Sequence, residues 1–241
     1  MSKAALRTPQ KEQAMTARTE IAGLILNGGQ AMRMGGVDKG ALELAGRPML
    51  IHVIDRIRPQ VGHLAISIRA GRTLPRIAGD TPPGCASGAL RALIDQPGPP
   101  IGPIAGIEAG LAWAATLTPC PRALLVVPND APLLPEGLVR GLLAALPAGG
   151  PPRPAVAASF GRIHPVVSLW PLALAPRVSA LADTARACAS GGGRAASLGG
   201  ALAALGAVAA DFPARRDGGD PFLNINTPTA LAVADAAARR G

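Results

Sequence analysis

Short, almost wholly apolar runs separate stretches in which apolar residues recur at helical spacing. The runs lie at residues 21–26, 64–68 and 124–127. Runs of this length without polar positions are typical of strands buried on both faces of a sheet. In the stretches between them the apolar residues fall on one side of a helix, namely Met49, Leu50, Val53, Ile54 and Ile57 in the first and Ile104, Ile107, Leu111 and Ala115 in the second. Strands that alternate with helices predict an α/β fold, Rossmann-like, with a mostly parallel sheet and helices on both faces.

The two ends of the chain differ in character. Residues 1–20 hold charged and polar side chains and no apolar core, so we expect a flexible N-terminal tail and not a secretory signal, with Met15 as an alternative start. Near the other end, Thr227 and Pro228 have the order of an N-cap and a first-turn proline, which predicts a terminal helix. Residues 21–241 are expected to form a single domain.

Composition and charge narrow the class of ligand. The formal net charge is +9, and the 24 basic residues include only three Lys. A basic protein attracts polyanions such as nucleotides, nucleic acid or phosphorylated metabolites. The Arg residues are scattered and the aromatic residues, 2% of the chain, form no stacking series, so nucleic acid is not the expected partner.

Cysteine usage and hydropathy bear on where the protein works. Cys85, Cys120 and Cys188 are widely spaced and form no Cys-x-x-Cys pair, so neither a disulfide framework nor a zinc cage is expected. The longest uncharged stretch, residues 195–210, is interrupted by glycines and is shorter than the about 20 residues that span a bilayer. We therefore expect a cytoplasmic protein without a membrane span.

A glycine-rich loop follows the first apolar run. Gly28 and Gly29 come directly after the predicted strand, where they allow the backbone to turn with positive φ and let amide groups approach a phosphate. Arg33 and Lys39 add positive charge, and Lys39 is the only lysine after residue 11. The spacing fits neither G-x-x-x-x-G-K-[S/T] nor G-x-G-x-x-G, which argues against Walker-type NTPases and nicotinamide-binding Rossmann enzymes.

Residues 24–40 resemble the L-x-G-G-x-x-x-R-M-G-x-x-D-K signature of nucleotidyltransferases, and in particular that of the molybdenum cofactor guanylyltransferase (molybdopterin-guanine dinucleotide synthase) family. Four later places are similar to the family as well: Asp95 with residues 102–106, residues 128–132 (Pro-Asn-Asp-Ala-Pro), His164-Pro165, and residues 222–228 (Phe-Leu-Asn-Ile-Asn-Thr-Pro). The resemblance extends from residue 21 to the end of the chain. It implies a fold of the nucleotide-diphospho-sugar transferase type.

The activity that the resemblance implies is transfer of GMP from GTP to molybdopterin or Mo-molybdopterin, with Mg²⁺ as cofactor and release of pyrophosphate. It is also compatible with transient contacts to proteins that build and deliver the cofactor. Carried over position by position, it implies three groups of site residues. The catalytic group is Lys39, Arg33 and Asp130, the last of which binds the metal; the GTP-binding group is Leu26, Asn27, Gly28, Gly29, Lys39, Ser67, Asp95, Gly102, Gly106 and Asp130; the acceptor group is His164, Asn224 and Asn226.

The residues support several of these roles independently. Asp130 follows the apolar strand at 124–127, where open α/β sheets bind their ligands, and a carboxylate is a hard ligand that suits Mg²⁺. Asn224 and Asn226 are expected to alternate along a short strand, with both carboxamides on one side. The Asp95 carboxylate can accept from the adjacent N–H and NH₂ groups of guanine, which favours GTP over CTP. His164 is expected on the acceptor side or in a structural role, since a phosphate nucleophile needs no general base.

Other readings of these positions stay open. Asp130, Asp95 and the two asparagines also suit turns, and Asn27 and Ser67 stand where the family commonly has other residues, so their roles are undecided. Arg162 and residues 191–194 are further candidates for contact with the pterin. At the level of function, the alternatives are a molybdopterin cytidylyltransferase, a sugar-phosphate-type nucleotidyltransferase, and a nucleotide-binding module without catalysis.

Overall fold

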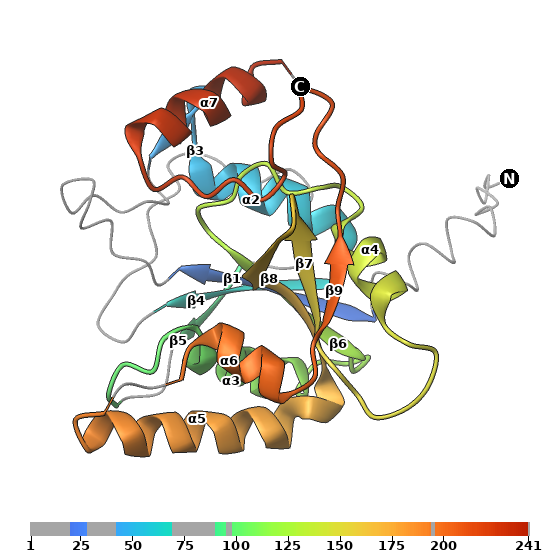
Figure 1. The fold of residues 1–241 in the computed structure, drawn as a ribbon, viewed down its shortest axis with the longest axis vertical. Helices are drawn as coiled ribbons and strands as arrows, with labels where there is room; N and C mark the ends of the chain where they lie inside the picture. The colour runs from blue at the N-terminus through green and yellow to red at the C-terminus, as the bar shows by residue number, and fades with distance from the viewer. Residues whose placement is uncertain (1–19, 28–41, 69–89, 95–97, 194–195, 241) are drawn as a thin grey trace, which may run out of the picture.

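The computed structural model in Figure 1 describes residues 20–27, 42–68, 90–94, 98–193 and 196–240. Its main sheet is seven-stranded, in the order β5-β4-β1-β6-β8-β7-β9. The strands are β1 (Ile21–Asn27), β4 (His63–Ile68), β5 (Arg91–Ile94), β6 (Ala123–Pro128), β7 (Ala155–Ser159), β8 (Arg162–Pro171) and β9 (Val208–Asp211), and a separate antiparallel pair is formed by β2 (Glu43–Leu44) and β3 (Arg47–Pro48). The helices are α2 (Met49–Ile57), α3 (Pro103–Ala114), α4 (Leu138–Ala145), α5 (Ala175–Ser190), α6 (Leu198–Ala204) and α7 (Pro228–Ala238), with short 3-10 turns at Arg58–Gln60 and Leu172–Leu174.

The sheet is mostly parallel, as expected. Strand β1 pairs in parallel with β4 and β6, and β4 pairs in parallel with β5. Strand β8 is antiparallel to both of its neighbours, β6 and β7, whereas β9 is parallel to β7. Within this sheet all strands other than β8 therefore run in one direction, so the carboxyl ends of β1, β4 and β6 share one edge.

Helices cover both faces of the sheet. On β1, Ile21 and Ile25 point to one face and pack with side chains of α2 and α4, while Leu24 and Leu26 point to the other and pack with α3, α5 and α6. Figure 1 shows the same division, with α3, α5 and α6 below the sheet and α2 above it. Because both faces of β1 are covered, the strand carries almost no polar residue, which explains the continuous apolar run in the sequence.

The terminal helix α7 closes a third, smaller core. Ala234 on this helix packs with Leu44, Met49, Leu133 and Ile225. The helix begins where the sequence predicts, since the Thr227 side chain accepts a hydrogen bond from the backbone N–H of Ala230 at 3.1 Å. In Figure 1, α7 lies on the outer side of α2, so the C-terminal segment returns to the first half of the domain.

Two details of the predicted elements are wrong. Ala115 lies one residue beyond the end of α3 and is exposed, and the buried side of this helix includes Glu108 and Trp113 instead. Asn224 and Asn226 lie in an irregular segment and not on a strand. In the described part of the chain, no helix is both long and apolar enough to cross a membrane.

Candidate functional site

The carboxyl edge of the parallel strands brings several predicted site residues together. In the register of the sheet, Leu26 on β1 lies opposite Ser67 on β4 and Pro128 on β6. Asn27 ends β1, and Asp130 lies two residues beyond Pro128. The structure therefore places the polar residues that follow three neighbouring strands at the same edge of the sheet.

Asn129 links the ends of β1 and β6. This residue is 4% exposed; its side-chain amide donates a short hydrogen bond to the Asn27 carboxamide oxygen, and its backbone N–H donates to the Leu26 carbonyl at 3.1 Å. Asn129 is not among the residues that the sequence predicts for the site. Its place between an apolar strand and an aspartate was the one feature of the sequence that could have indicated a role. The hydrogen bond itself could not be predicted, because its partner Asn27 is distant in the sequence. The link fixes the backbone from which Asp130 projects.

Helix α3 approaches this edge closely at Gly106. A Cβ atom on Gly106 would lie 2.6 Å from Leu26 Cδ2 and 2.8 Å from Ser67 Oγ, so glycine permits the contact. Gly102, which precedes the helix, has φ of 73°, a conformation that favours glycine. The predicted nucleotide contacts Leu26, Ser67, Gly102 and Gly106 thus come from three elements that meet at one place.

The C-terminal segment reaches the same edge beside Asp130. The backbone N–H of Ile225 donates to the Asp130 carbonyl at 2.8 Å. Ile225 is fully buried, whereas Asn224 and Asn226 on either side of it are exposed. The two asparagines are therefore both exposed on either side of a buried residue, but the strand that was predicted for them is absent. No ladder forms because the Ile225 N–H bonds to a loop carbonyl and the Asn226 N–H bonds locally to the Asn224 carbonyl at 3.1 Å.

His164 belongs to a chain of hydrogen bonds next to that segment. Its Nε2 lies 2.8 Å from Ser159 Oγ, and the Ser159 hydroxyl donates to Asp220 Oδ1 at 2.8 Å, so His164 Nε2–H is the donor to Ser159. Asp220 Oδ1 also accepts from the Phe222 backbone N–H at 2.8 Å. The serine lies between the imidazole and the carboxylate, which is not the order of a nucleophilic triad.

The surroundings of His164 keep its imidazole neutral over a wider pH range. Burial lowers the pKa of His164 below its ordinary value, and the charge of Arg162 acts in the same direction, while the charge of Asp220 opposes both. The Phe222 ring lies against the imidazole with a centroid separation of 4.8 Å. His164 is thus joined by packing and by hydrogen bonds to the segment that carries Asn224 and Asn226.

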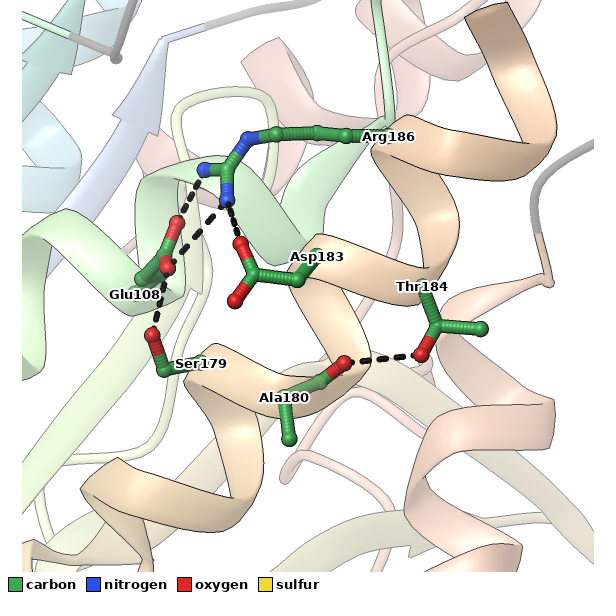
Figure 2. Close-up of polar contacts among 6 residues, drawn as sticks. All are labelled: Glu108, Ser179, Ala180, Asp183, Thr184 and Arg186. Carbon is green, nitrogen blue, oxygen red and sulfur yellow. Dashed lines mark hydrogen bonds and ion pairs between the residues drawn. The ribbon is translucent and has the colours of Figure 1, made fainter. Parts of the chain in front are cut away.

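A partly buried ion pair joins α3 to α5, as Figure 2 shows. Glu108 on α3 accepts a short hydrogen bond from Arg186 on α5 and a second bond, at 3.0 Å, from the Ser179 hydroxyl. Arg186 also contacts Asp183 at 3.0 Å, and these carboxylates, Glu108 first, raise the pKa of Arg186. Because Glu108 lies two residues after Gly106, the pair supports the helix that forms one wall of the site.

Comparison with known proteins agrees with this geometry. Residues 23–209 match the family model described as a MobA-like NTP transferase domain. The chain belongs to this family. A protein of Rhodobacter capsulatus named molybdenum cofactor guanylyltransferase is 41% identical over 219 residues, which are 89% of this chain and 95% of the relative. A protein of Cereibacter sphaeroides with the same name is 39% identical over 218 residues, 90% of this chain and 97% of the relative.

Solved structures show the same fold at lower sequence identity. Molybdopterin-guanine dinucleotide biosynthesis protein A of Archaeoglobus fulgidus has a TM-score of 0.61 and 18% identity, over 91% of this chain and 100% of that chain. A 4-diphosphocytidyl-2C-methyl-D-erythritol synthase of Anaerococcus prevotii has a TM-score of 0.62 and 14% identity, over 94% and 99%. The fold is therefore that of nucleotidyltransferases of the nucleotide-diphospho-sugar transferase type.

The remaining predicted residues of this MobA-like domain are not all within the described part of the chain. Gly28, Gly29, Arg33, Lys39 and Asp95 lie outside the described residues, as does Arg194. Arg162 is exposed at the start of β8, and residues 191–193 follow the end of α5. Among the described residues, no three His, Cys, Asp or Glu side chains gather in a way that could hold a metal ion. A metal at Asp130 would then take most of its ligands from elsewhere.

Proposed function

We propose that this chain transfers GMP from GTP to molybdopterin or Mo-molybdopterin, forming the guanine dinucleotide form of the molybdenum cofactor and releasing pyrophosphate. Two findings support the proposal: the names of the curated relatives, and the placing of Asp130 between Asn129 and the Ile225 hydrogen bond at the carboxyl edge of β6. The position of Asp130 is the structural observation on which the proposed function mainly rests. Sheets of this kind bind ligands at that edge.

The reaction requires stabilisation of the negative charge on the phosphates more than general acid or base catalysis. An oxygen of the acceptor's terminal phosphate forms a bond to the α-phosphorus of GTP, and the bond from that phosphorus to the pyrophosphate oxygen breaks. The attacking phosphate is already ionised at neutral pH and requires no general base. His164, buried and bonded to Ser159, accordingly holds its neighbours in place and takes no proton from the acceptor.

Asp130 is the residue that would hold Mg²⁺. A single carboxylate at the edge, partly exposed, fits a cation that usually keeps several waters and takes its other ligands from substrate phosphates. When bound, the ion neutralises charge on the triphosphate. The chain's own contribution is a carboxylate whose backbone is held on both sides, by Asn129 and by Ile225.

The glycine loop supplies positive charge in this proposal. Lys39 and Arg33, together with the amide groups of Gly28 and Gly29, stabilise the charge that develops on the α-phosphate and the leaving pyrophosphate. These roles follow from the sequence motif. The loop leaves the end of β1 at Asn27, which lies at the same edge as Asp130.

The base and the acceptor are assigned to opposite sides of Asp130. On the side of β1 and β4, Leu26, Ser67 and Gly106 lie close together, and Asp95 reads the Watson–Crick edge of guanine. On the other side, Asn224 and Asn226 face the acceptor phosphate. We further propose that the reaction takes place in the cytoplasm, with transient contacts to proteins that supply or receive the cofactor, and without nucleic acid or membrane partners.

Pyrophosphate release tests the proposal. The purified protein is incubated with molybdopterin, Mg²⁺ and GTP, CTP, ATP or UTP in turn, and the dinucleotide product is identified by mass. We expect release with GTP. Preference for CTP would favour a cytidylyltransferase, turnover with a sugar phosphate in place of molybdopterin would favour the wider nucleotidyltransferase class, and GTP binding without turnover would favour a non-catalytic module.

A further inference from the structure

Strands β7 and β8 are joined by a tight turn that carries an unexpected residue. The turn consists of Phe160 and Gly161, with φ of 51° and 71°. Positive φ at both central positions is typical of a type I′ turn, in which Asn-Gly is the preferred pair. Phenylalanine is strained in this conformation. The residue is also 67% exposed, so the position gains little from burial.

The hairpin that presents Phe160 is firmly anchored. Ser159, which directly precedes Phe160, is 2% exposed and bonds to both His164 and Asp220 at 2.8 Å. Across the turn, Ser159 pairs with Arg162 in the ladder between β7 and β8. The strained residue therefore projects from a fixed base.

The hairpin lies on the acceptor side of the proposed site. Strand β8 runs against β6, with Ser168 opposite Val126, so the first residues of β8 extend past the carboxyl end of β6. The Phe222 ring on the segment next to Asn224 packs on His164 of this hairpin at 4.8 Å. Because the sheet order places β1 and β4 on one side of β6 and β8 and β7 on the other, the turn lies on the side of β6 away from the guanine contacts.

The other two phenylalanines of the chain show what an ordinary structural role looks like. Phe212 and Phe222 pack edge to face with a centroid separation of 5.3 Å, and Phe222 is 2% exposed. Phe160 has no such ring contact among the described residues, and its neighbour Ile163 is 49% exposed. Strain and exposure together are unfavourable for folding, and strained residues that persist are typical of ligand sites.

We infer that Phe160 is the aromatic surface on which the pterin of the acceptor stacks. The inference rests on the proposed function, since the acceptor must reach the α-phosphorus from the side of Asn224 and Asn226. A rigid hairpin tip presents a ring at little further entropic cost on binding. Ile163 adds apolar surface beside it.

The substitution Phe160→Asn separates this role from a structural one. Asparagine suits the turn better than phenylalanine, so the variant should melt at the same temperature as the parent or higher. Loss of a stacked ring should raise the KM and the Kd for molybdopterin by about 5- to 150-fold, the equivalent of a typical aromatic–base stack, and leave the KM for GTP unchanged. Phe160→Trp, which keeps an aromatic ring at this position, should retain the parent's acceptor affinity. Val233→Asn, at an exposed apolar position on α7, is the matched control and should change neither constant.

The readouts distinguish the two proposals. Acceptor binding is measured with molybdopterin alone, by equilibrium dialysis, and GMP transfer is measured separately. Transfer by the parent together with an unchanged acceptor constant in Phe160→Asn would overturn the stacking role and leave the proposed function standing. A parent that binds molybdopterin through Phe160 but transfers no GMP would contradict the proposed function alone. A parent that neither binds molybdopterin nor transfers GMP to it would overturn both the stacking role and the proposed function.

Discussion

The backbone N–H of Ile225 donates to the carbonyl oxygen of Asp130 at 2.8 Å. This single hydrogen bond joins the loop after β6 to the segment that precedes α7, two parts of the chain that lie far apart in the sequence. Ile225 is buried in the small core under α7, so the bond is shielded and holds the loop in one position. As a result, Asn224 and Asn226 flank a point that is fixed to the Asp130 backbone.

The Asn27–Asn129 pair should contribute measurably to stability. Replacing Asn27 with Ala removes the acceptor of the buried Asn129 amide, and an unsatisfied buried donor costs about 1–3 kcal/mol. We expect the free energy of unfolding in urea to fall by that amount. The double variant Asn27→Ala/Asn129→Leu should lose less than the sum of the single variants, because both polar groups are removed together. Strict additivity would show that the two side chains do not interact.

Two glycines on α3 allow a matched test of whether this helix contacts GTP at Gly106. Gly106→Ala would push against Leu26 and Ser67, and Gly110→Ala would push against Leu24 and Leu124 at similar distances. Overpacking costs about 1–3 kcal/mol, and the better helix propensity of Ala returns about 1 kcal/mol. We expect similar losses of stability from both variants, but a raised KM for GTP only from Gly106→Ala. An equal effect of both on that KM would mean that Gly106 has no special place in the site.

Lys39 should be needed for turnover and not for folding. Removal of one preorganised charge-stabilising group typically lowers kcat by about 10²- to 10³-fold. We expect Lys39→Ala to lose at least the lower figure and to keep the far-UV spectrum and melting temperature of the parent. Lys11→Ala, a lysine of the N-terminal tail, serves as the control for loss of charge. Near-normal turnover of Lys39→Ala would reject the assigned role.

His164 should make stability depend on pH below neutrality. Because burial lowers its pKa in the folded protein below the ordinary 6.5, the unfolded chain binds the proton more readily. The free energy of unfolding should therefore be highest above pH 6.5, fall as the pH drops from 6.5 towards the lowered pKa of His164, and level off below that pKa. His164→Gln keeps an N–H donor for Ser159 but does not titrate, so its unfolding free energy should change less from about pH 5 to 6.5. Parallel pH profiles for the two proteins would contradict the neutral, buried histidine.

The first half of the domain was readily predictable from the sequence. Strands β1, β4 and β6 are apolar on both faces, and helix α2 carries its buried residues on one stripe, so the pattern predicts both. The helix N-cap at Thr227 could also be predicted from the sequence, because capping depends on residues that are close together in the chain. The expectation that the site lies at the carboxyl edge of these strands then followed from the parallel topology alone.

The second half of the domain was harder to predict, because its hydrophobic patterns are weak and its important contacts join residues that are distant in the sequence. Strands β7 and β9 are short and rich in Ala, and β8 includes Pro165, so no clear alternation marks them. The buried side of α5 consists of Val178, Ala182 and Ala185, small residues that barely differ from the rest of an Ala-rich chain. The contacts of Asn129 with Asn27, and of Glu108 with Arg186, depend on partners that only the folded chain brings together.

The role of Asp130 in catalysis is tested by the effect of Asp130→Ala on pyrophosphate release from GTP with molybdopterin and Mg²⁺ present. Asp211→Ala, at an exposed aspartate that ends β9, is the matched control. We expect Asp130→Ala to lower kcat by at least about 10²-fold with an unchanged melting temperature, while Asp211→Ala stays within about twofold of the parent. Turnover by a folded Asp130→Ala protein at close to the parent rate would contradict the central claim.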